Sequence, residues 1–246
     1  MTSPLPAAER ARIAALLAPT GVLRAGINLS NFLLVSRRTP DGGPAGVSPD
    51  MARALADSLG LRLHYVPYPN PAQVADAAGK DEWDVALIGA EPQRAEVIAF
   101  TPAYAEIEAT YLVPEKSTAQ TVADVDAPGR RIAAADRTAF GLWLDRNLKA
   151  AEIHRVATMD DALAAFRTHD LDALAGLRAR LIDDQKAVPG SRILDGRFMT
   201  VQQAIGVPRA KEGALAYLVD FVADARRTGL VQELIRRHKV QGLTAA

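Results

Sequence analysis

The sequence contains no cysteine, which excludes disulfide bonds, thiolate catalysis and cysteine-ligated metal sites. It also lacks an excess of charge of either sign, because 29 lysines and arginines balance 29 aspartates and glutamates among 246 residues. A basic field that would attract nucleic acid or an anionic membrane surface is therefore missing. No stretch approaches the ~18 consecutive apolar residues of a membrane-spanning helix. We expect a globular protein with no nucleic-acid partner and no membrane span.

The motifs of common catalytic and nucleotide-binding sites are missing as well. The glycines form neither a GxGxxG nor a GxxxxGKS/T loop, and no serine lies in a GxSxG elbow. The histidines are dispersed, with no pair four residues apart, at His64, His154, His169 and His238. We therefore expect no metal site, no cofactor and no acyl-transfer catalysis.

The first 20 residues are expected to form an N-terminal helical extension. They carry Glu9 and two arginines before a short apolar stretch, and so they lack the basic start and apolar segment of a secretory signal. The sequence as given therefore shows no export signal. Composition alone is compatible with the periplasm and with the cytoplasm.

What the sequence does contain is a regular alternation of strand-like and helix-like segments. In the first half, the expected elements are a strand over 21–30, a helix that Ser48 caps and Gly60 ends, a strand over 61–65, a short helix over 72–78 and a buried strand over 84–89. Short connections of this kind predict parallel strands with right-handed crossovers, and a ligand crevice at the strands' carboxyl ends. We expect Asn31, Tyr68 and the segment after Gly89 to meet there.

A second α/β unit follows. Its expected elements are strands over 110–113 and 131–135, a helix over 138–148, a strand over 153–157, a helix over 160–168 and a strand over 173–177. A strand over 203–207 and helices over 212–228 and 231–237 come last. The two halves share no repeated motif, so any duplication is one of architecture only.

Three strings carry a resemblance to a known family: GINLSN, GVSPDMARALADSLG and EWDVALIGAEPQRAEVIAFTPAY. They resemble the family 3 extracellular solute-binding proteins, which serve polar amino-acid ABC transporters. In that family a strand with Asp-Val is followed by an arginine and then by a Phe-Ser/Thr-x-x-Tyr hinge entry. The matching positions here are Asp84, Arg94, Phe100, Thr101 and Tyr104. By order of elements, the resemblance extends from about Val22 to about Arg237.

The resemblance implies an α/β, two-lobed, periplasmic-binding-protein-like (type II) fold, in which each lobe is a mostly parallel sheet flanked by helices and two hinge crossings join the lobes. Residues 21–105 with 201–246 are expected in lobe 1, and residues 106–200 in lobe 2. Binding would shift the populations of open and closed forms. The implied setting is the periplasm, with the protein a monomer that serves an ABC permease.

The resemblance assigns the solute's carboxylate to Arg94, whose guanidinium stays charged and offers two parallel donors. Gly89 replaces a serine of the family and leaves a backbone N–H in place of a hydroxyl. In the second lobe, Arg137, Thr138 and Ala139 are expected at a helix N-terminus, where free N–H groups could grip an anion. A simpler alternative is that Thr138 only caps this helix.

Neutral and aromatic side chains complete the predicted site. Asn28 and Asn31 follow the first strand, where family members place an acidic and an aromatic contact; the alternative role of both is turn formation. Tyr68 and Phe140 are expected to form an apolar wall of the pocket. Trp143 is expected in the core.

Arg178 departs from the family pattern. Amino-acid binders have an aspartate near this position that pairs with the solute's ammonium group, whereas this sequence has no carboxylate after Leu177 until Asp183. If Arg178 faces the crevice, the site would suit a dicarboxylate, a keto acid or another organic anion. The alternative is an ordinary surface position at the start of a helix.

Three functions are compatible with these features. The first is a receptor of an ABC-type importer for a small polar or anionic solute, an amino acid or an organic acid, that performs no chemistry. The second is a lyase resembling cyclohexadienyl dehydratase, for which Glu91, Glu106 and Glu108 are the candidate general acids. The third is a sensory receptor whose ligand-closed form is recognised by a protein partner.

Overall fold

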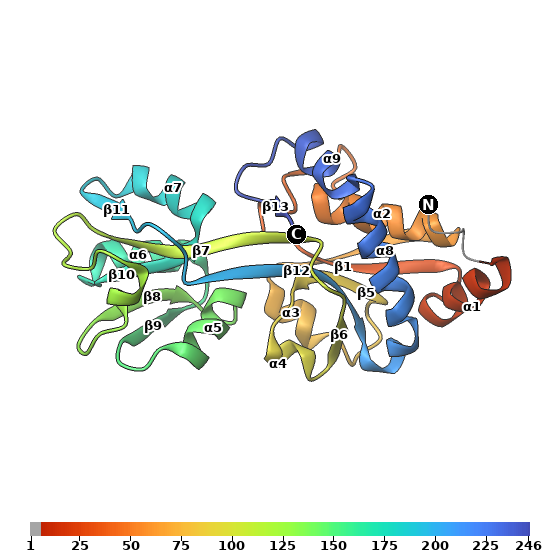
Figure 1. Ribbon diagram of the computed structural model, residues 1–246, viewed down its shortest axis with the longest axis horizontal. Helices are drawn as coiled ribbons and strands as arrows, with labels where there is room; N and C mark the ends of the chain where they lie inside the picture. Colours follow the sequence, from red (N-terminus) through yellow and green to blue (C-terminus); the bar gives the residue numbers. More distant parts are fainter. Residues whose placement is uncertain (1–5) are drawn as a thin grey trace. The chain divides into compact units, whose positions relative to one another are not determined.

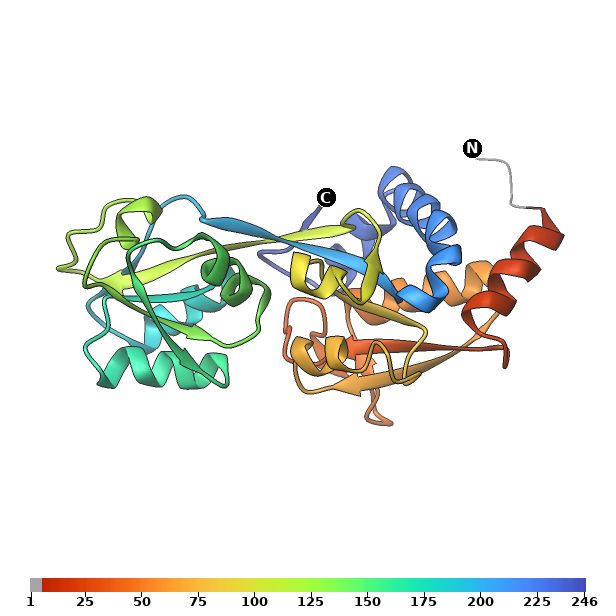
Figure 2. The same cartoon turned by 90° about the horizontal axis from the view of Figure 1, so that it is seen from below.

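The computed structural model describes residues 6–246, and the chain divides into two compact units (Figure 1). Unit 1 contains the described residues up to Glu106 together with Gln202–Ala246, and unit 2 is Ile107–Val201. The chain passes between them twice, within strands β7 (Ala105–Pro114) and β12 (Met199–Pro208), which Figure 2 also shows. The boundaries expected at 105/106 and 200/201 adjoin these crossings.

Unit 1 is built on a sheet in the order β4–β1–β5–β12, with β6 paired to β12. Strand β1 is parallel to both β4 and β5, whereas β12 is antiparallel to β5 and β6. Its elements are α1 (Ala7–Leu17), β1 (Val22–Asn28), β2 (Arg37–Arg38), β3 (Pro44–Ala45), α2 (Val47–Leu59), β4 (Arg62–Tyr68), α3 (Pro71–Asp76), β5 (Val85–Gly89), α4 (Pro92–Ala95), β6 (Ile98–Phe100), the 3-10 helix Arg209–Ala214, α8 (Leu215–Arg227), α9 (Leu230–Arg237) and β13 (Thr244–Ala245).

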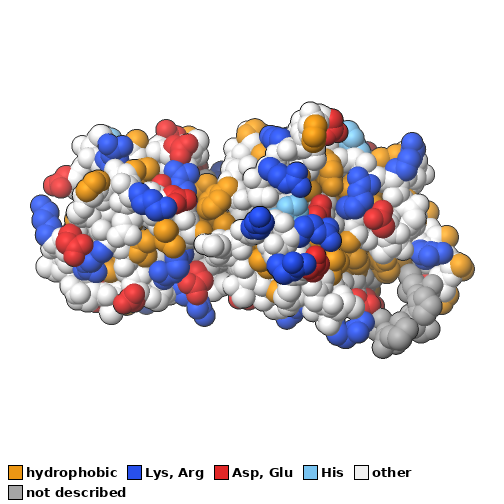
Figure 3. Space-filling view, turned by 90° about the horizontal axis from the view of Figure 1, so that it is seen from above, with side chains coloured by type: hydrophobic (Ala, Val, Ile, Leu, Met, Phe, Trp, Pro, Cys, Tyr) orange, Lys and Arg blue, Asp and Glu red, His pale blue; other side chains and the backbone are white. Residues whose placement is uncertain are grey.

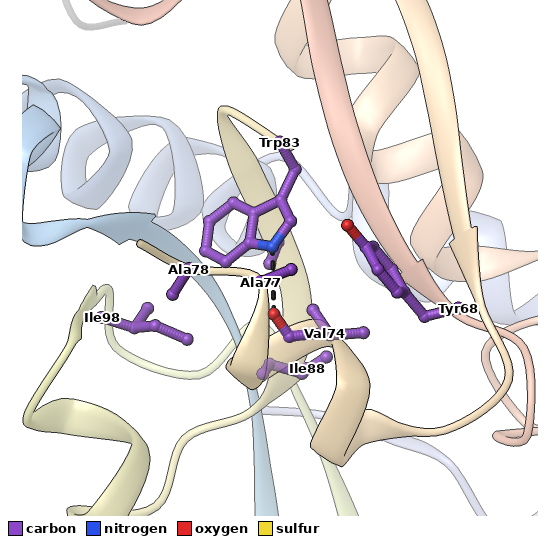
Figure 4. Close-up of a cluster of buried hydrophobic side chains, with 8 residues drawn as sticks. Tyr68, Val74, Ala77, Ala78, Trp83, Ile88 and Ile98 are labelled. Atoms are coloured by element: carbon purple, nitrogen blue, oxygen red, sulfur yellow. Dashed lines mark hydrogen bonds between the residues drawn. The ribbon is translucent and has the colours of Figure 1, made fainter. Parts of the chain in front are cut away.

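Helices cover both faces of this sheet because the side chains of each strand alternate between them. On β4, the Tyr65 hydroxyl donates to the Pro49 carbonyl of α2 at 3.0 Å. Tyr68 points the other way, into a core cluster under α3 (Figure 4). Val66 packs against the same cluster. Trp83 closes this cluster, with its indole N–H donating to the Val74 carbonyl at 3.0 Å. Packing of α3 on this cluster therefore holds the end of β4 and the start of β5 in place.

A glycine, and not the predicted serine cap, sets the start of α2. Gly46 has a φ of 153°, and a Cβ there would lie 2.3 Å from the Leu34 carbonyl oxygen. Ser48 lies inside the helix, where its hydroxyl donates to that same carbonyl at 3.4 Å. The prediction that Ser48 caps α2 is therefore wrong, because a close backbone approach that requires glycine decides the helix start. Gly60, with a φ of 69°, ends the helix as predicted.

A buried carboxylate ties four elements of unit 1 together. Asp84, 1% exposed and directly before β5, accepts from the Arg24 guanidinium at 2.7 Å and from the Lys211 ammonium. Lys211 also donates to the Leu17 carbonyl at the end of α1, at 2.9 Å. The N-terminal helix is thus packed on unit 1, with Ile13 and Leu17 buried.

Unit 2 contains a sheet in the order β7–β10–β8–β9, with β11 paired to β7. Its further elements are the 3-10 helix Val122–Val125, β8 (Arg131–Ala135), α5 (Ala139–Asn147), β9 (Glu152–Val156), α6 (Met159–Thr168), β10 (Ala173–Leu177), α7 (Arg178–Ala187) and β11 (Ser191–Ile193). Strand β8 is parallel to β9 and β10, whereas β7 is antiparallel to β10. Helices α6 and α7 share a core cluster that contains Leu112 of β7.

Most expected elements are present, and the differences have physical reasons. Strands β8 and β10 have the predicted bounds. The strands expected over 110–113 and 203–207 are each part of a ten-residue strand, because β7 and β12 also carry the chain from one unit to the other. The helix expected over 212–228 is divided into a 3-10 turn and α8.

Candidate functional site

The carboxyl ends of the parallel strands of unit 1 bring three predicted site residues to one edge. Strand β1 ends at Asn28, which is the register partner of Tyr68 at the end of β4, and β5 ends at Gly89. In open α/β sheets this edge is the usual ligand-binding edge, because loops and helix N-termini gather there.

Arg94 lies at this edge and is 4% exposed. It belongs to the short helix α4 directly after β5, and its Nη1 donates to the Gly89 carbonyl oxygen at 2.7 Å. Glu91, also 4% exposed, occupies the N-cap position of the same helix. The last carbonyl of β5 therefore fixes one end of the guanidinium, a group suited to bidentate binding of a carboxylate.

Asn28 and Asn31 are engaged in the turn that follows β1. The Asn28 Oδ1 accepts from the Ser30 backbone N–H at 3.1 Å and from the Ser30 hydroxyl at 2.9 Å. The Asn31 Oδ1 accepts from the Leu33 N–H at 3.2 Å. Both side-chain carbonyls thus have the turn-forming role that the sequence offered as an alternative.

Tyr68, expected at a pocket wall, packs in the core of unit 1. Its ring belongs to the core cluster with Trp83 (Figure 4). Its hydroxyl donates to the Glu82 Oε2 at 2.8 Å. Glu82 precedes β5, so the hydroxyl points away from the edge at which Gly89 lies. Burial and the hydrogen bond to Glu82 raise the pKa of Tyr68. The strand alternation of β4 places this side chain under α3, which the sequence position at the end of a strand did not reveal.

In unit 2, the corresponding edge carries the N-terminus of α5. Thr138 is the N-cap residue, since its Oγ1 accepts from the Gly141 N–H at 3.0 Å and donates to the Ala135 carbonyl at 2.9 Å. Arg137 adopts a left-handed backbone with a φ of 51°, and Ala139 is the first residue of the helix. The predicted capping role of Thr138 is confirmed. The geometry also presents the first backbone N–H groups of α5 at this edge, as anion binding requires.

The burial of two aromatic residues on α5 is the reverse of what the sequence predicted. Phe140, predicted as a pocket wall, is 2% exposed, whereas Trp143, predicted as core, is partly exposed. The reason is helical periodicity, because Phe140 and Leu144 form the buried i, i+4 stripe and Trp143 lies at its border. Trp143 packs against Phe198, with ring centroids 5.2 Å apart. Sequence reasoning missed Phe198, which no motif marks.

Arg178 has a carboxylate partner that the sequence did not identify. Its Nε donates to the Glu108 Oε2 at 2.9 Å, and the Glu108 Oε1 accepts from Arg197 at 2.9 Å. Arg178 also donates to the Gly196 carbonyl. Burial alone would raise the pKa of Glu108, but the hydrogen bonds from the two arginines outweigh it and hold the pKa below its usual value. The sequence indicated no carboxylate near Arg178, and the structure corrects this by showing Glu108 as its partner.

The described part of the chain, residues 6–246, has no group of three or more histidine, aspartate and glutamate side chains that could hold a metal ion. None of its helices combines the length and the apolar character that crossing a membrane would require. On the face shown in Figure 3, basic and acidic side chains are interspersed over each unit, as the balanced composition predicts.

Comparison with known proteins identifies relatives of this chain. The family model described as bacterial extracellular solute-binding proteins, family 3, matches residues 23–241. A cyclohexadienyl dehydratase of Pseudomonas aeruginosa is 35% identical over 114 residues, which are 45% of this chain and 42% of that protein. The chain thus aligns with less than half the length of this curated relative.

Solved structures show the same fold. A mutant of the arginine-binding protein ArgBP from T. maritima superposes with a TM-score of 0.73 at 18% identity, covering 93% of this chain and all of that one. The amino acid ABC transporter substrate-binding protein AbpA from Streptococcus pneumoniae, bound to L-arginine, gives 0.72 at 16% identity, covering 92% of this chain and 98% of that one. The predicted α/β fold of the type II periplasmic binding proteins is confirmed.

Proposed function

The chain belongs to family 3 of the bacterial extracellular solute-binding proteins, and from this we propose that it is a receptor that binds a small carboxylate-bearing solute and releases it unchanged. The family description supports a location outside the cytoplasm. We propose the periplasm as this location and an ABC-type importer as the system that the receptor serves.

The buried guanidinium of Arg94 carries the proposal. Burying an arginine is unfavourable unless hydrogen bonds satisfy it, and the surroundings of Arg94, which is 4% exposed, supply such bonds at the carboxyl end of β5. Its hydrogen bond to the Gly89 carbonyl sets its direction. In this proposal Arg94 binds the solute's carboxylate with two parallel N–H···O bonds. The amide groups of Asn28 and Asn31, at the end of β1, add polar contacts in the same unit.

Unit 2 by itself has a further proposed anion-binding element, the N-terminus of α5. Thr138 shapes this turn, Arg137 and Ala139 flank it, and the backbone N–H groups of the first helical turn are suited to a negatively charged oxygen. The proposed solutes are amino acids and organic acids, because both carry the carboxylate that Arg94 requires.

Calorimetric titration with a panel of amino acids, keto acids and dicarboxylates tests the proposal. Arg94→Ala should weaken binding by roughly 2–5 kcal/mol, as expected when one partner of a desolvated charge pair is removed. Arg62→Ala is the matched control, because Arg62 is an exposed arginine on β4. Equal affinities of the Arg94→Ala variant and the unchanged protein would overturn the assignment.

A dehydratase is the second candidate, favoured by the 35% identity over 114 residues to cyclohexadienyl dehydratase. Such chemistry needs a general acid that donates a proton to the leaving hydroxyl while the C–O bond breaks and its electron pair goes to oxygen. A ring C–carboxylate or C–H bond breaks as well, so that its electron pair forms the new double bond and CO2 or a proton leaves. Glu108 is poorly suited, because its two arginine partners lower its pKa. Glu91 is buried close in sequence to Arg94 and is the best-placed acid.

A spectroscopic assay separates the two functions. The protein is incubated with a carboxylate-bearing cyclohexadienol, and elimination of water is followed by the ultraviolet absorption of the aromatic product. A receptor leaves the absorption unchanged while still binding acids. An increase that Glu91→Gln abolishes would establish the enzyme.

A further inference from the structure

Three aromatic rings stack in unit 2. The Phe198 ring centroid lies 4.5 Å from that of Tyr111, with the planes tilted by 31°, and 5.2 Å from that of Trp143, with a tilt of 37°. These separations are in the range of favourable aromatic pairs. Tyr111 is 1% exposed, whereas Phe198 and Trp143 are partly exposed. The stack therefore begins in the core at Tyr111 and reaches the surface at Trp143.

The stack lies at the carboxyl edge of the parallel strands of unit 2. Leu177, the last residue of β10, is the register partner of Ala109, and the Phe198 N–H donates to the Ala109 carbonyl at 3.1 Å. Helix α5 begins at this edge, and Trp143 follows its first turn. Helical side chains lean toward the N-terminus of their helix, so the indole leans toward the edge as well. Ligands of open α/β sheets bind there.

Packing on the core does not by itself explain the position of the partly exposed rings of Phe198 and Trp143. On the same helix, Phe140 and Leu144 are buried, so α5 already has its core stripe without Trp143. Trp143 instead rests on Phe198, which Tyr111 supports from the core side. A rigid ring supported from one side is suited to hold a second flat group on its other side, because aromatic surfaces bind planar groups at low cost in conformational entropy.

We propose that Trp143 and Phe198 form an aromatic shelf that binds a planar apolar group of the solute. The substrate class is then an acid that carries an aromatic or cyclic unsaturated group. This inference rests on the proposed function, because the shelf acts on the solute that the receptor binds. It adds a property of unit 2 that selects among carboxylate-bearing solutes.

Matched pairs of acids test the shelf. Calorimetry compares L-phenylalanine with L-alanine and phenylpyruvate with pyruvate, since the members of each pair share a head group and differ in the ring. In the unchanged protein we expect the ring-bearing member of at least one pair to bind tenfold or more tightly than its partner. Trp143→Ala should reduce that ratio to within about twofold while the affinity for the ring-free acid changes little. Phe198→Leu, which keeps the apolar volume, should give the same result.

Controls separate binding from folding. Phe166→Leu removes a buried ring from the core of unit 2 under α6, and it should lower the melting temperature without changing the affinity ratios. In a Trp83→Phe background Trp143 is the only tryptophan, so its fluorescence should change when a ring-bearing acid is added and stay constant with the ring-free acid.

Each outcome has a distinct meaning. Binding of acids with equal affinity within both pairs would overturn the shelf and leave the receptor function intact. If Trp143→Ala lowers the affinity for both members of a pair equally, Trp143 has a structural role, and this result would also overturn the shelf. Failure of every acid to bind the unchanged protein would overturn the proposed function and the shelf with it.

Discussion

The Nε of Arg178 lies 2.9 Å from the Oε2 of Glu108, although the two residues are 70 positions apart in the sequence. Antiparallel pairing of β7 with β10 brings them together, because Leu177 is the register partner of Ala109. Arg197 binds the other oxygen of the same carboxylate. Two arginines thus share one carboxylate, and the cluster carries one net positive charge.

We propose that Arg178 can bind a carboxylate of the solute, for which Glu108 would then be an internal competitor. We therefore expect Glu108→Gln to increase the affinity for succinate relative to propionate at least threefold, because the substitution releases Arg178 and Arg197 from their internal anion. Calorimetry of both acids on the variant and the unchanged protein measures the ratio. A constant ratio would assign Arg178 to the structure of unit 2 alone. The effect on stability should stay within about 1 kcal/mol, since the Glu108 side chain is 42% exposed.

Asp84 should be far more important for stability than its neighbour Asp81, although both pair with Arg24. Asp84 is 1% exposed, whereas the Asp81 side chain is 82% exposed. Asp84→Ala leaves Arg24 and Lys211 without their buried counter-ion, so we expect a loss of about 3–5 kcal/mol in the free energy of unfolding. Asp81→Ala should cost about 1 kcal/mol or less. Urea denaturation of the two variants gives the comparison, and similar losses would refute this account of the cluster.

Asp84 should also make stability depend on acid pH. Burial alone would raise its pKa, but the hydrogen bonds from Arg24 and Lys211 prevail and hold the pKa below the ordinary value of 3.8. The unfolded state therefore binds a proton at a higher pH than the folded state does. The stability that Asp84 contributes is complete above its pKa in the unfolded state. It is lost as the pH falls through its lower pKa in the folded state. Denaturation between pH 6 and roughly pH 2 should show a steeper decline for the unchanged protein than for Asp84→Asn.

Tyr104 should tolerate the loss of its hydroxyl. The Tyr104 hydroxyl is buried and has no hydrogen-bond partner among the residues that the structure describes. Tyr104→Phe removes an unsatisfied polar group, so we expect unchanged or increased stability, by up to about 1 kcal/mol. Tyr68→Phe is the matched control, because it deletes the hydrogen bond to Glu82 and should cost about 0.5–1.5 kcal/mol. A larger loss in Tyr104→Phe than in Tyr68→Phe would contradict the prediction.

The two glycines that border α2 should respond differently to alanine. Gly46→Ala places a Cβ 2.3 Å from the Leu34 carbonyl oxygen, which forces the backbone of the preceding loop to move. At Gly60 nothing lies within 4 Å of the new Cβ, so only its left-handed φ of 69° is unfavourable. We expect Gly60→Ala to lower stability by about 1–2 kcal/mol and Gly46→Ala by clearly more. Thermal denaturation monitored by circular dichroism measures both, and equal shifts would show that the loop adapts without strain.

Local patterns in the sequence were sufficient to predict most helices and strands and part of the candidate site. The bounds of β8 and β10, the cap at Thr138 and the end of α2 at Gly60 depend on neighbouring residues, and all were predicted. A motif placed Arg94 after a buried strand, and the structure has it there, oriented by the last carbonyl of that strand.

The sequence by itself thus determined the family, the order of strands and helices and the position of Arg94, the arginine for which we propose carboxylate binding. Only the tertiary structure decided that Tyr68 faces the core, that Glu108 neutralises Arg178 and that Phe198 supports Trp143. The physical reason is that local patterns depend on residues within a few positions of one another. Each of these three contacts instead depends on which strands pair, in which register, and on which face of the sheet a side chain falls.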